Sequence, residues 1–140
     1  MKKKTYVIFE HTADIGIRVS GSNLKDLFKN AGLAIFELSS EKISNQDKSH
    51  KEISIQQKAD NLEELFLNWL NEVLSLSAAK GVIFESFKFK RLDEKNLQAM
   101  GVGSSITNYK VNTEIKAATY HQLKIKKNKS GWQAEVILDV

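Results

Sequence analysis

Residues 6–19 read YVIFEHTADIGIRV, and the rest of the chain is best interpreted outward from this stretch. Its first four residues are apolar or aromatic, and from Ile15 to Val19 apolar residues alternate with others, the period of a half-buried strand. Between the two strands stand groups that can carry chemistry: Glu10, His11, Thr12 and Asp14. Polar residues at such a connection form either a turn that satisfies its own backbone or a functional site. The stretch therefore predicts a strand pair and leaves both roles open.

The composition is that of an ordinary globular chain. Of the 140 residues, 41% are hydrophobic and 27% are charged, which places the chain far from the disordered class. There is no cysteine, so disulfides and thiolate metal sites are excluded. The N-terminus lacks the pattern of a signal peptide, and no apolar run has the length of a membrane span. We expect a single domain over residues 1–140, located in the cytoplasm and not in a membrane.

The net charge of +4 comes almost wholly from lysine, since Arg18 and Arg91 are the only arginines. Lysine offers a strongly hydrated point charge, whereas bidentate recognition of guanine or phosphate favours arginine. The lysine groups, including the one at residues 124–129, are therefore interpreted as solvated faces. Loose attraction to RNA or to an acidic partner stays open.

Two segments have the apolar spacing of amphipathic helices. The first covers about residues 24–38, after a turn at Gly21-Ser22-Asn23. The second covers about residues 61–78 and follows a variant of the capping box at residues 60–63. Trp69 lies in the middle of its apolar stripe, so we assign this side chain to the core.

The remaining segments predict strands and loops. Residues 53–55, 82–91, 97–103, 114–125 and 132–140 are expected to be strands, the fourth with a bulge, and residues 39–50 a loop. The Gly/Ser-rich residues 101–105 lack the ending of a phosphate-binding loop, and we expect a bulge or flexible rim loop there. This order predicts an α+β fold in which two amphipathic helices pack on one side of a largely antiparallel multi-stranded sheet.

The end of the chain suggests a partner for Asp14. The last expected strand places the Asp139 side chain next to the α-carboxylate of Val140, and a hard cation would relieve the repulsion between two adjacent carboxylates. Asp14 could supply a third oxygen donor for a Ca²⁺- or Mg²⁺-type site. The alternatives are that Asp139 simply faces solvent, or that His11, His121 and Asp14 form a transition-metal site.

Four blocks together resemble the archease family: EHTADIG at residues 10–16, WLNE at 69–72, EIKAATYH at 114–121, and the closing GW at 131–132 with DV at 139–140. The resemblance implies a small α+β protein that is not itself an enzyme. It implies an activator of the GTP-dependent RNA ligase of tRNA splicing and RNA repair, which promotes ligase guanylylation and multiple turnover. It also implies a bound divalent cation, usually calcium, although Mg²⁺ or another ion remains open. The matching metal positions are Asp14, Asp139 and Val140.

The same resemblance suggests a partner surface. Lys116, His121 and His11 are the expected contacts with the ligase, and RNA is expected to be reached through the ligase. The chain departs from the family pattern at residues 101–109, where an acid is missing and Tyr109 stands in place of a histidine, and at Asn68, where an aspartate is common. Two rival functions remain: a metal-dependent phosphoesterase or other hydrolase, and a lysine-driven RNA-binding module.

Overall fold

The computed structural model describes residues 5–140 apart from Thr12 and Ala13, and only the backbone of Glu10 and His11. The elements follow in the order β1 (Tyr6–His11), β2 (Asp14–Gly21), α1 (Leu24–Ser39), β3 (Ser40–Lys42), β4 (His50–Lys58), α2 (Leu62–Lys80), β5 (Val82–Leu92), β6 (Asn96–Ser105), a 3-10 turn (Ile106–Asn108), β7 (Tyr109–Val111), β8 (Ala117–Asn128) and β9 (Gly131–Asp139).

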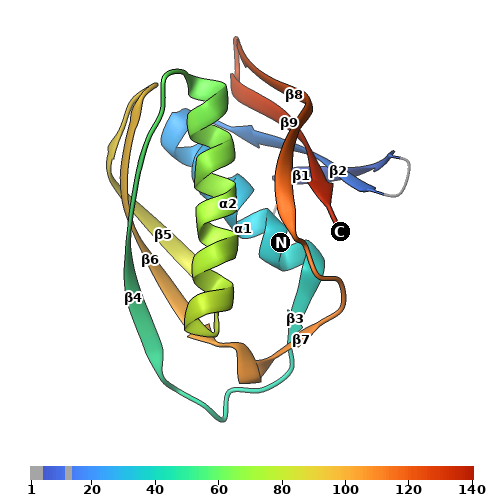
Figure 1. Ribbon diagram of the computed structural model, residues 1–140, viewed down its shortest axis with the longest axis vertical. Coiled ribbons are helices and arrows are strands. Elements are labelled where there is room, and N and C mark those ends of the chain that lie inside the picture. The colour runs from blue at the N-terminus through green and yellow to red at the C-terminus, as the bar shows by residue number, and fades with distance from the viewer. Residues whose placement is uncertain (1–4, 12–13) are drawn as a thin grey trace.

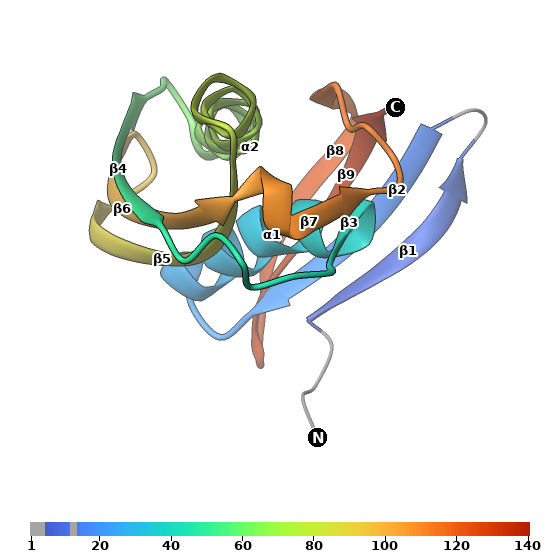
Figure 2. The same cartoon turned by 90° about the horizontal axis from the view of Figure 1, so that it is seen from below.

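The two helices lie between two sheets. The larger sheet has the strand order β1-β2-β9-β8 and the smaller one β4-β6-β5, while β3 and β7 form a separate two-stranded ribbon. Figure 1 shows α2 between the smaller sheet and the β8–β9 pair, and Figure 2 shows the same layers from below. All strand pairs are antiparallel. The expected α+β class is confirmed. The helices do not lie on one side of a single sheet, however: the strands divide into three sheets, and each helix packs against strands of both larger ones.

Helix α1 follows the predicted pattern closely. Its first turn is capped by Asn23, whose side-chain oxygen accepts a hydrogen bond from the Asp26 N–H at 2.8 Å. The apolar stripe is buried in the core through Leu27, Phe28, Ala31, Ala34 and Ile35. The helix predicted for residues 24–38 ends one residue later, at Ser39.

Helix α2 is the longer of the two, and its last three residues, 78–80, are exposed. Asn61 caps its start by accepting from the Glu64 N–H at 2.8 Å, and Gly81 ends it in the left-handed conformation with φ 66°. Trp69 is fully buried, which confirms its predicted place in the core. None of the described helices is long and apolar enough to cross a lipid bilayer.

Two local expectations were wrong. The segment 39–50, expected to be a loop, contains β3, which pairs with β7 through Ser40–Val111 and Lys42–Tyr109. A three-residue strand is too short to produce a recognisable period, so only its distant partner reveals it.

Residues 101–105 form a regular part of β6 and not a rim loop. A Cβ atom at Gly101 would lie 2.6 Å from a ring carbon of Phe84, and one at Gly103 would lie 2.7 Å from Cβ of Val82. These glycines permit close packing, and the bulge lies on the neighbouring strand β5, between Phe84 and Ser86.

Candidate functional site

The candidate metal residues lie at one end of the four-stranded sheet. Ile15 of β2 pairs with Leu138 of β9, and the antiparallel register continued by one residue sets Asp14 beside Asp139. On the other side of β9, Asp139 pairs with Ala117 of β8. The second and the last strand of the chain are thus neighbours, and Figure 1 shows the C-terminus at this end of the sheet.

Burial changes sharply at the end of β9. Leu138 is fully buried, whereas Asp139 is exposed and Asp14 is half-buried. Val140 is half-buried and packs against the core, so its side chain anchors the last residue beside Asp139. The final strand is therefore a regular docked element that extends to the penultimate residue of the chain.

The chemistry of the donors suits a hard cation. Among the side chains that the structure describes, no three His, Cys, Asp or Glu groups form a metal cluster by themselves. The α-carboxylate of Val140 is the predicted third anionic donor beside Asp14 and Asp139. Carboxylate oxygens completed by water are the ligands that Ca²⁺ and Mg²⁺ prefer. The donor chemistry of Asp14, Asp139 and Val140 suits such an ion, and their role as its ligands stays a prediction.

Of the other predicted site residues, Lys116 lies next to the candidate metal site and His121 lies farther from it along β8. The Lys116 N–H donates to the backbone oxygen of Asp139 at 2.8 Å, so Lys116 directly flanks the candidate metal site. His121 is exposed farther along β8, inside the irregular segment between Thr119 and Lys124. In that segment Gln122 has φ 55°, a left-handed conformation that costs free energy in a residue other than glycine.

The predictions for the β1–β2 connection fall largely outside the described residues. The backbone of His11 pairs with Asp14, but the side chain of His11 and the residues Thr12 and Ala13 are not described. The proposed contact through His11 and the two-histidine metal site therefore stay predictions.

Asn71 is a residue of this region that sequence reasoning missed. Its side-chain oxygen accepts from the Ala118 N–H at 2.8 Å, and its side-chain nitrogen donates to the Ala118 carbonyl at 3.2 Å. A side chain of α2 thus takes the place of a neighbouring strand at the start of β8. Ala118 follows Ala117, which pairs with Asp139. The two hydrogen bonds between Asn71 and Ala118, which we call the Asn71 clamp, therefore hold β8 beside the candidate metal site. Its only signal in the sequence was its place in the WLNE block.

Replacing Asn71 with leucine should lower the free energy of unfolding by about 1–3 kcal/mol, because the N–H and carbonyl of Ala118 lose their partners. The Ala118 amide should also exchange faster with deuterated solvent. Urea denaturation and hydrogen exchange measure the two effects. Asn68→Leu on the same helix is the matched control, since among the described residues the Asn68 side chain makes a single long hydrogen bond, of 3.5 Å, to the Lys58 carbonyl. Equal losses in the two variants would show that the clamp adds nothing.

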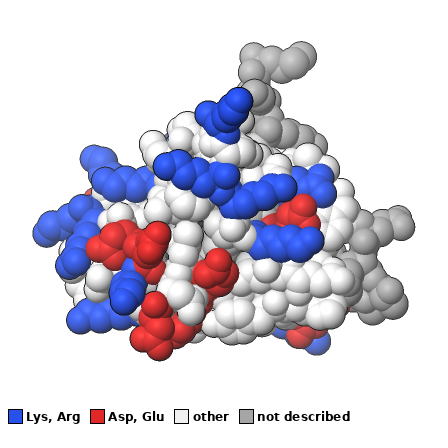
Figure 3. Space-filling view, turned by 90° about the horizontal axis from the view of Figure 1, so that it is seen from above, with Lys and Arg blue, Asp and Glu red and all other residues white. Residues whose placement is uncertain are grey.

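The lysines of residues 124–129 lie on the β8–β9 hairpin and are all exposed, as their interpretation as solvated groups requires. Figure 3 views the molecule from above and shows basic side chains on this face with acidic ones among them. One such pair is Arg18 and Glu135 on β2 and β9, with 3.0 Å between Nε and Oε1. The surface is therefore of mixed sign, which gives the lysine-driven RNA-binding alternative no particular support.

The chain matches a family model over almost its whole length. The model of the archease protein family (MTH1598/TM1083) matches residues 6–140. Protein archease of Methanosarcina barkeri is 35% identical over 145 aligned residues, which cover 98% of this chain and 97% of that protein. Protein archease of Pyrococcus furiosus is 36% identical, with 94% and 96% covered.

Solved structures agree with these sequence matches. The solution structure of Methanobacterium thermoautotrophicum protein 1598 has a TM-score of 0.70 and 25% identity, and covers 99% of this chain and 100% of its own. The crystal structure of an archease from Thermotoga maritima, described as a possible chaperone, has a TM-score of 0.64 and 25% identity, with 100% and 98% covered. The resemblance carried by the four sequence blocks is thereby confirmed.

Proposed function

The chain belongs to the archease family, and from that premise we propose that it is a non-catalytic, divalent-metal-binding activator of a GTP-dependent RNA ligase. It would promote guanylylation of the ligase and its multiple turnover in tRNA splicing and RNA repair. One observation supports the proposal above all: the register of β2 and β9 brings Asp14 next to Asp139 and the chain end. Three carboxylates at one sheet end suit a cation that is shared with a partner.

The proposed cation is Ca²⁺, with Mg²⁺ or another divalent ion also compatible with oxygen donors. When bound, the ion would supply a concentrated positive charge that attracts a carboxylate or phosphate of the ligase. The chain's own groups hold this charge at the rim of the sheet, where Asp139 is exposed and the backbone contact with Lys116 fixes the strand end. Lys116 and, less directly, His121 and His11 would contact the ligase around it.

This function needs no turnover by the protein itself. We assign it no catalytic residue and place it with its ligase in the cytoplasm, where RNA would be reached through the ligase. The family relationship supports an assisting role, since one relative is described as a possible chaperone.

A time course of ligase guanylylation tests the proposal. Purified ligase with GTP and Ca²⁺ should form the guanylylated enzyme faster when this protein is added, and ligation with excess RNA should continue beyond one turnover. An unchanged time course would refute the activator role. Phosphoesterase turnover by the protein alone, lost in Asp14→Ala, would support the hydrolase instead. Direct RNA affinity that falls steeply with salt would support the RNA-binding module.

A further inference from the structure

A separate pocket lies where α1, β3, β5 and β7 meet, and it shares no residue with the candidate metal site. Its volume is about 300 Å³, at the lower end of the range for small-molecule sites. Leu33, Phe36 and Phe84 supply apolar lining, while Glu37, Glu85 and Tyr109 supply polar lining. The pocket thus combines an apolar wall with carboxylates and an aromatic ring.

The β-bulge in β5 directs Glu85 toward this pocket. Phe84 pairs with Gly103 and Ser86 pairs with Val102, so Glu85 is an extra residue without a partner in β6. Bulges re-aim a side chain in this way and often occur next to functional sites. The side chain of Glu85 is only 27% exposed, so its charge is partly withdrawn from water.

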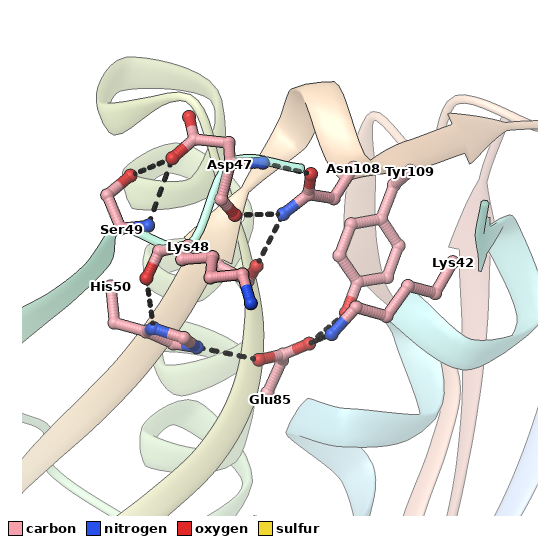
Figure 4. Close-up of polar contacts among 9 residues, drawn as sticks. Lys42, Asp47, Lys48, Ser49, His50, Glu85, Asn108 and Tyr109 are labelled. Carbon is pink, nitrogen blue, oxygen red and sulfur yellow. Dashed lines mark hydrogen bonds and ion pairs between the residues drawn. The ribbon is translucent and has the colours of Figure 1, made fainter. Parts of the chain in front are cut away.

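Donors from separate segments converge on the Glu85 carboxylate (Figure 4). Oε2 accepts hydrogen bonds from the Tyr109 hydroxyl and from Nζ of Lys42, the latter at 3.2 Å. Oε1 lies 3.6 Å from Nε2 of His50, which is beyond hydrogen-bonding distance. Within the part of the chain that the structure describes, Oε1 therefore keeps capacity for a further donor.

The protonation states favour a charged carboxylate. Burial raises the pKa of Glu85, but the hydrogen bond from Tyr109 and the charge of Lys42 outweigh it and hold the pKa below its ordinary value. Burial and the neighbouring Glu85 raise the pKa of the Tyr109 hydroxyl, which stays a neutral donor. At neutral pH Glu85 is therefore negatively charged beside the Tyr109 ring, and the Lys42 ammonium pairs with this charge.

Lys42 shows which kind of group this arrangement accepts. Its ammonium contacts Glu85 and lies 6.0 Å from the centre of the Tyr109 ring, so one cation meets both a carboxylate and an aromatic face. The Lys42 side chain is 40% exposed, and ion pairs with such exposure are weak. The ammonium of Lys42 can therefore leave Glu85 at little cost in free energy.

We propose that this pocket binds an aliphatic primary ammonium group, which takes the place of the Lys42 ammonium on Glu85. The carbon chain of the ligand packs along Phe36 and Phe84, and the charged end meets Glu85 and the Tyr109 ring. A free polyamine and the side chain of a lysine in another protein both present this group. The proposal is independent of the ligase-activator function and of the bound metal.

Titration of the ¹⁵N-labelled protein, followed by amide chemical shifts, tests the proposal with two probes, cadaverine and Nα-acetyl-lysine N-methylamide. We expect saturable shifts at Lys42, Glu85 and Tyr109. Glu85→Gln should weaken binding about tenfold or more, since it removes the charge-assisted hydrogen bond. Lys42→Met should strengthen binding because it removes the internal competitor. Glu41→Gln is the matched control and should bind like the wild type, since Glu41 is exposed on β3 but does not line the pocket.

The two probes also identify the source of the ammonium group. Saturable binding of cadaverine alone supports a free polyamine, binding of the lysine amide alone supports a protein side chain, and binding of both supports the shared chemistry. The proposal is overturned if neither probe saturates, or if Glu85→Gln binds as the wild type does. If the amide spectrum shows that Glu85→Gln does not fold, the affinity of Lys42→Met for the two probes tests the proposal instead. Weaker binding by Lys42→Met than by the wild type also overturns it.

Discussion

Replacing Asp14 with alanine should abolish both the stabilisation of the protein by Ca²⁺ and its activation of the proposed ligase partner, while the fold stays intact. With Ca²⁺ at 100 times its Kd, the wild type should gain about 2.7 kcal/mol. For a chain of this length this gain raises Tm by roughly 5–10 °C. Asp14→Ala removes one of three anionic donors, so thermal scans with and without Ca²⁺ should coincide. Asp139→Ala should behave in the same way.

Asp60→Ala is the matched control for this experiment. Asp60 is an exposed aspartate in the connection between β4 and α2, outside the strands that carry Asp14 and Asp139. The variant should keep both the Ca²⁺-dependent rise in Tm and the activation of the ligase. The metal role would be refuted if Asp14→Ala kept the full rise in Tm and activated the ligase as the wild type does.

Replacing Trp69 with alanine should cause the largest loss of stability, about 3–5 kcal/mol. The side chain is fully buried, and its ring centre lies 4.9 Å from that of Phe87 and 5.1 Å from that of Phe89. Its indole N–H donates to the carbonyl of Phe28 at 2.8 Å, so one residue of α2 contacts α1 and β5 together. Since domains have only about 5–15 kcal/mol in total, the variant should be marginally folded.

Denaturation in urea measures this loss, and Trp132→Ala is its control. Trp132 is half-buried on β9, near the β8–β9 hairpin, and Nζ of Lys127 lies 5.8 Å from its ring centre. Truncation there leaves no enclosed cavity, so the loss should be clearly smaller. A loss of less than about 1.5 kcal/mol for Trp69→Ala would contradict the central packing role, because truncating a buried aromatic normally costs more.

The two helices and most strands could be predicted because their signals are local. The apolar spacing that begins at Leu24 and the capping residues before each helix act within a few residues of themselves, and the structure reproduces both helices to within two residues. The capping pattern at residues 60–63 predicted Asp60 as the cap of α2, whereas the structure has Asn61, one residue later. The strict alternation of residues 132–140 likewise predicted β9, and Ala134, Val136 and Leu138 are buried as expected, whereas Ile137 on the opposite face is buried as well. The family, too, was evident from short blocks of sequence.

Pairing between distant segments left no such signal. β3 is recognised only by its partner β7, and the bulge that turns Glu85 into the pocket is a mismatch in length between two strands. Asn71 has the helical position of an ordinary flanking residue, and its hydrogen bonds to Ala118 arise only when α2 packs on β8. A sequence pattern reports the period of one segment and not the register between two.

The stretch at residues 6–19 shows what the sequence alone determines and what only the tertiary structure decides. The sequence by itself determined a strand pair, a family and three candidate carboxylates, because strand periodicity and residue chemistry are properties of short segments. Only the tertiary structure decided that β9 pairs with β2, which places Asp139 beside Asp14, and that Asn71 holds β8 on the other side. The physical reason is that sheet order follows from packing the whole core, which minimises exposed apolar surface across segments distant in the sequence.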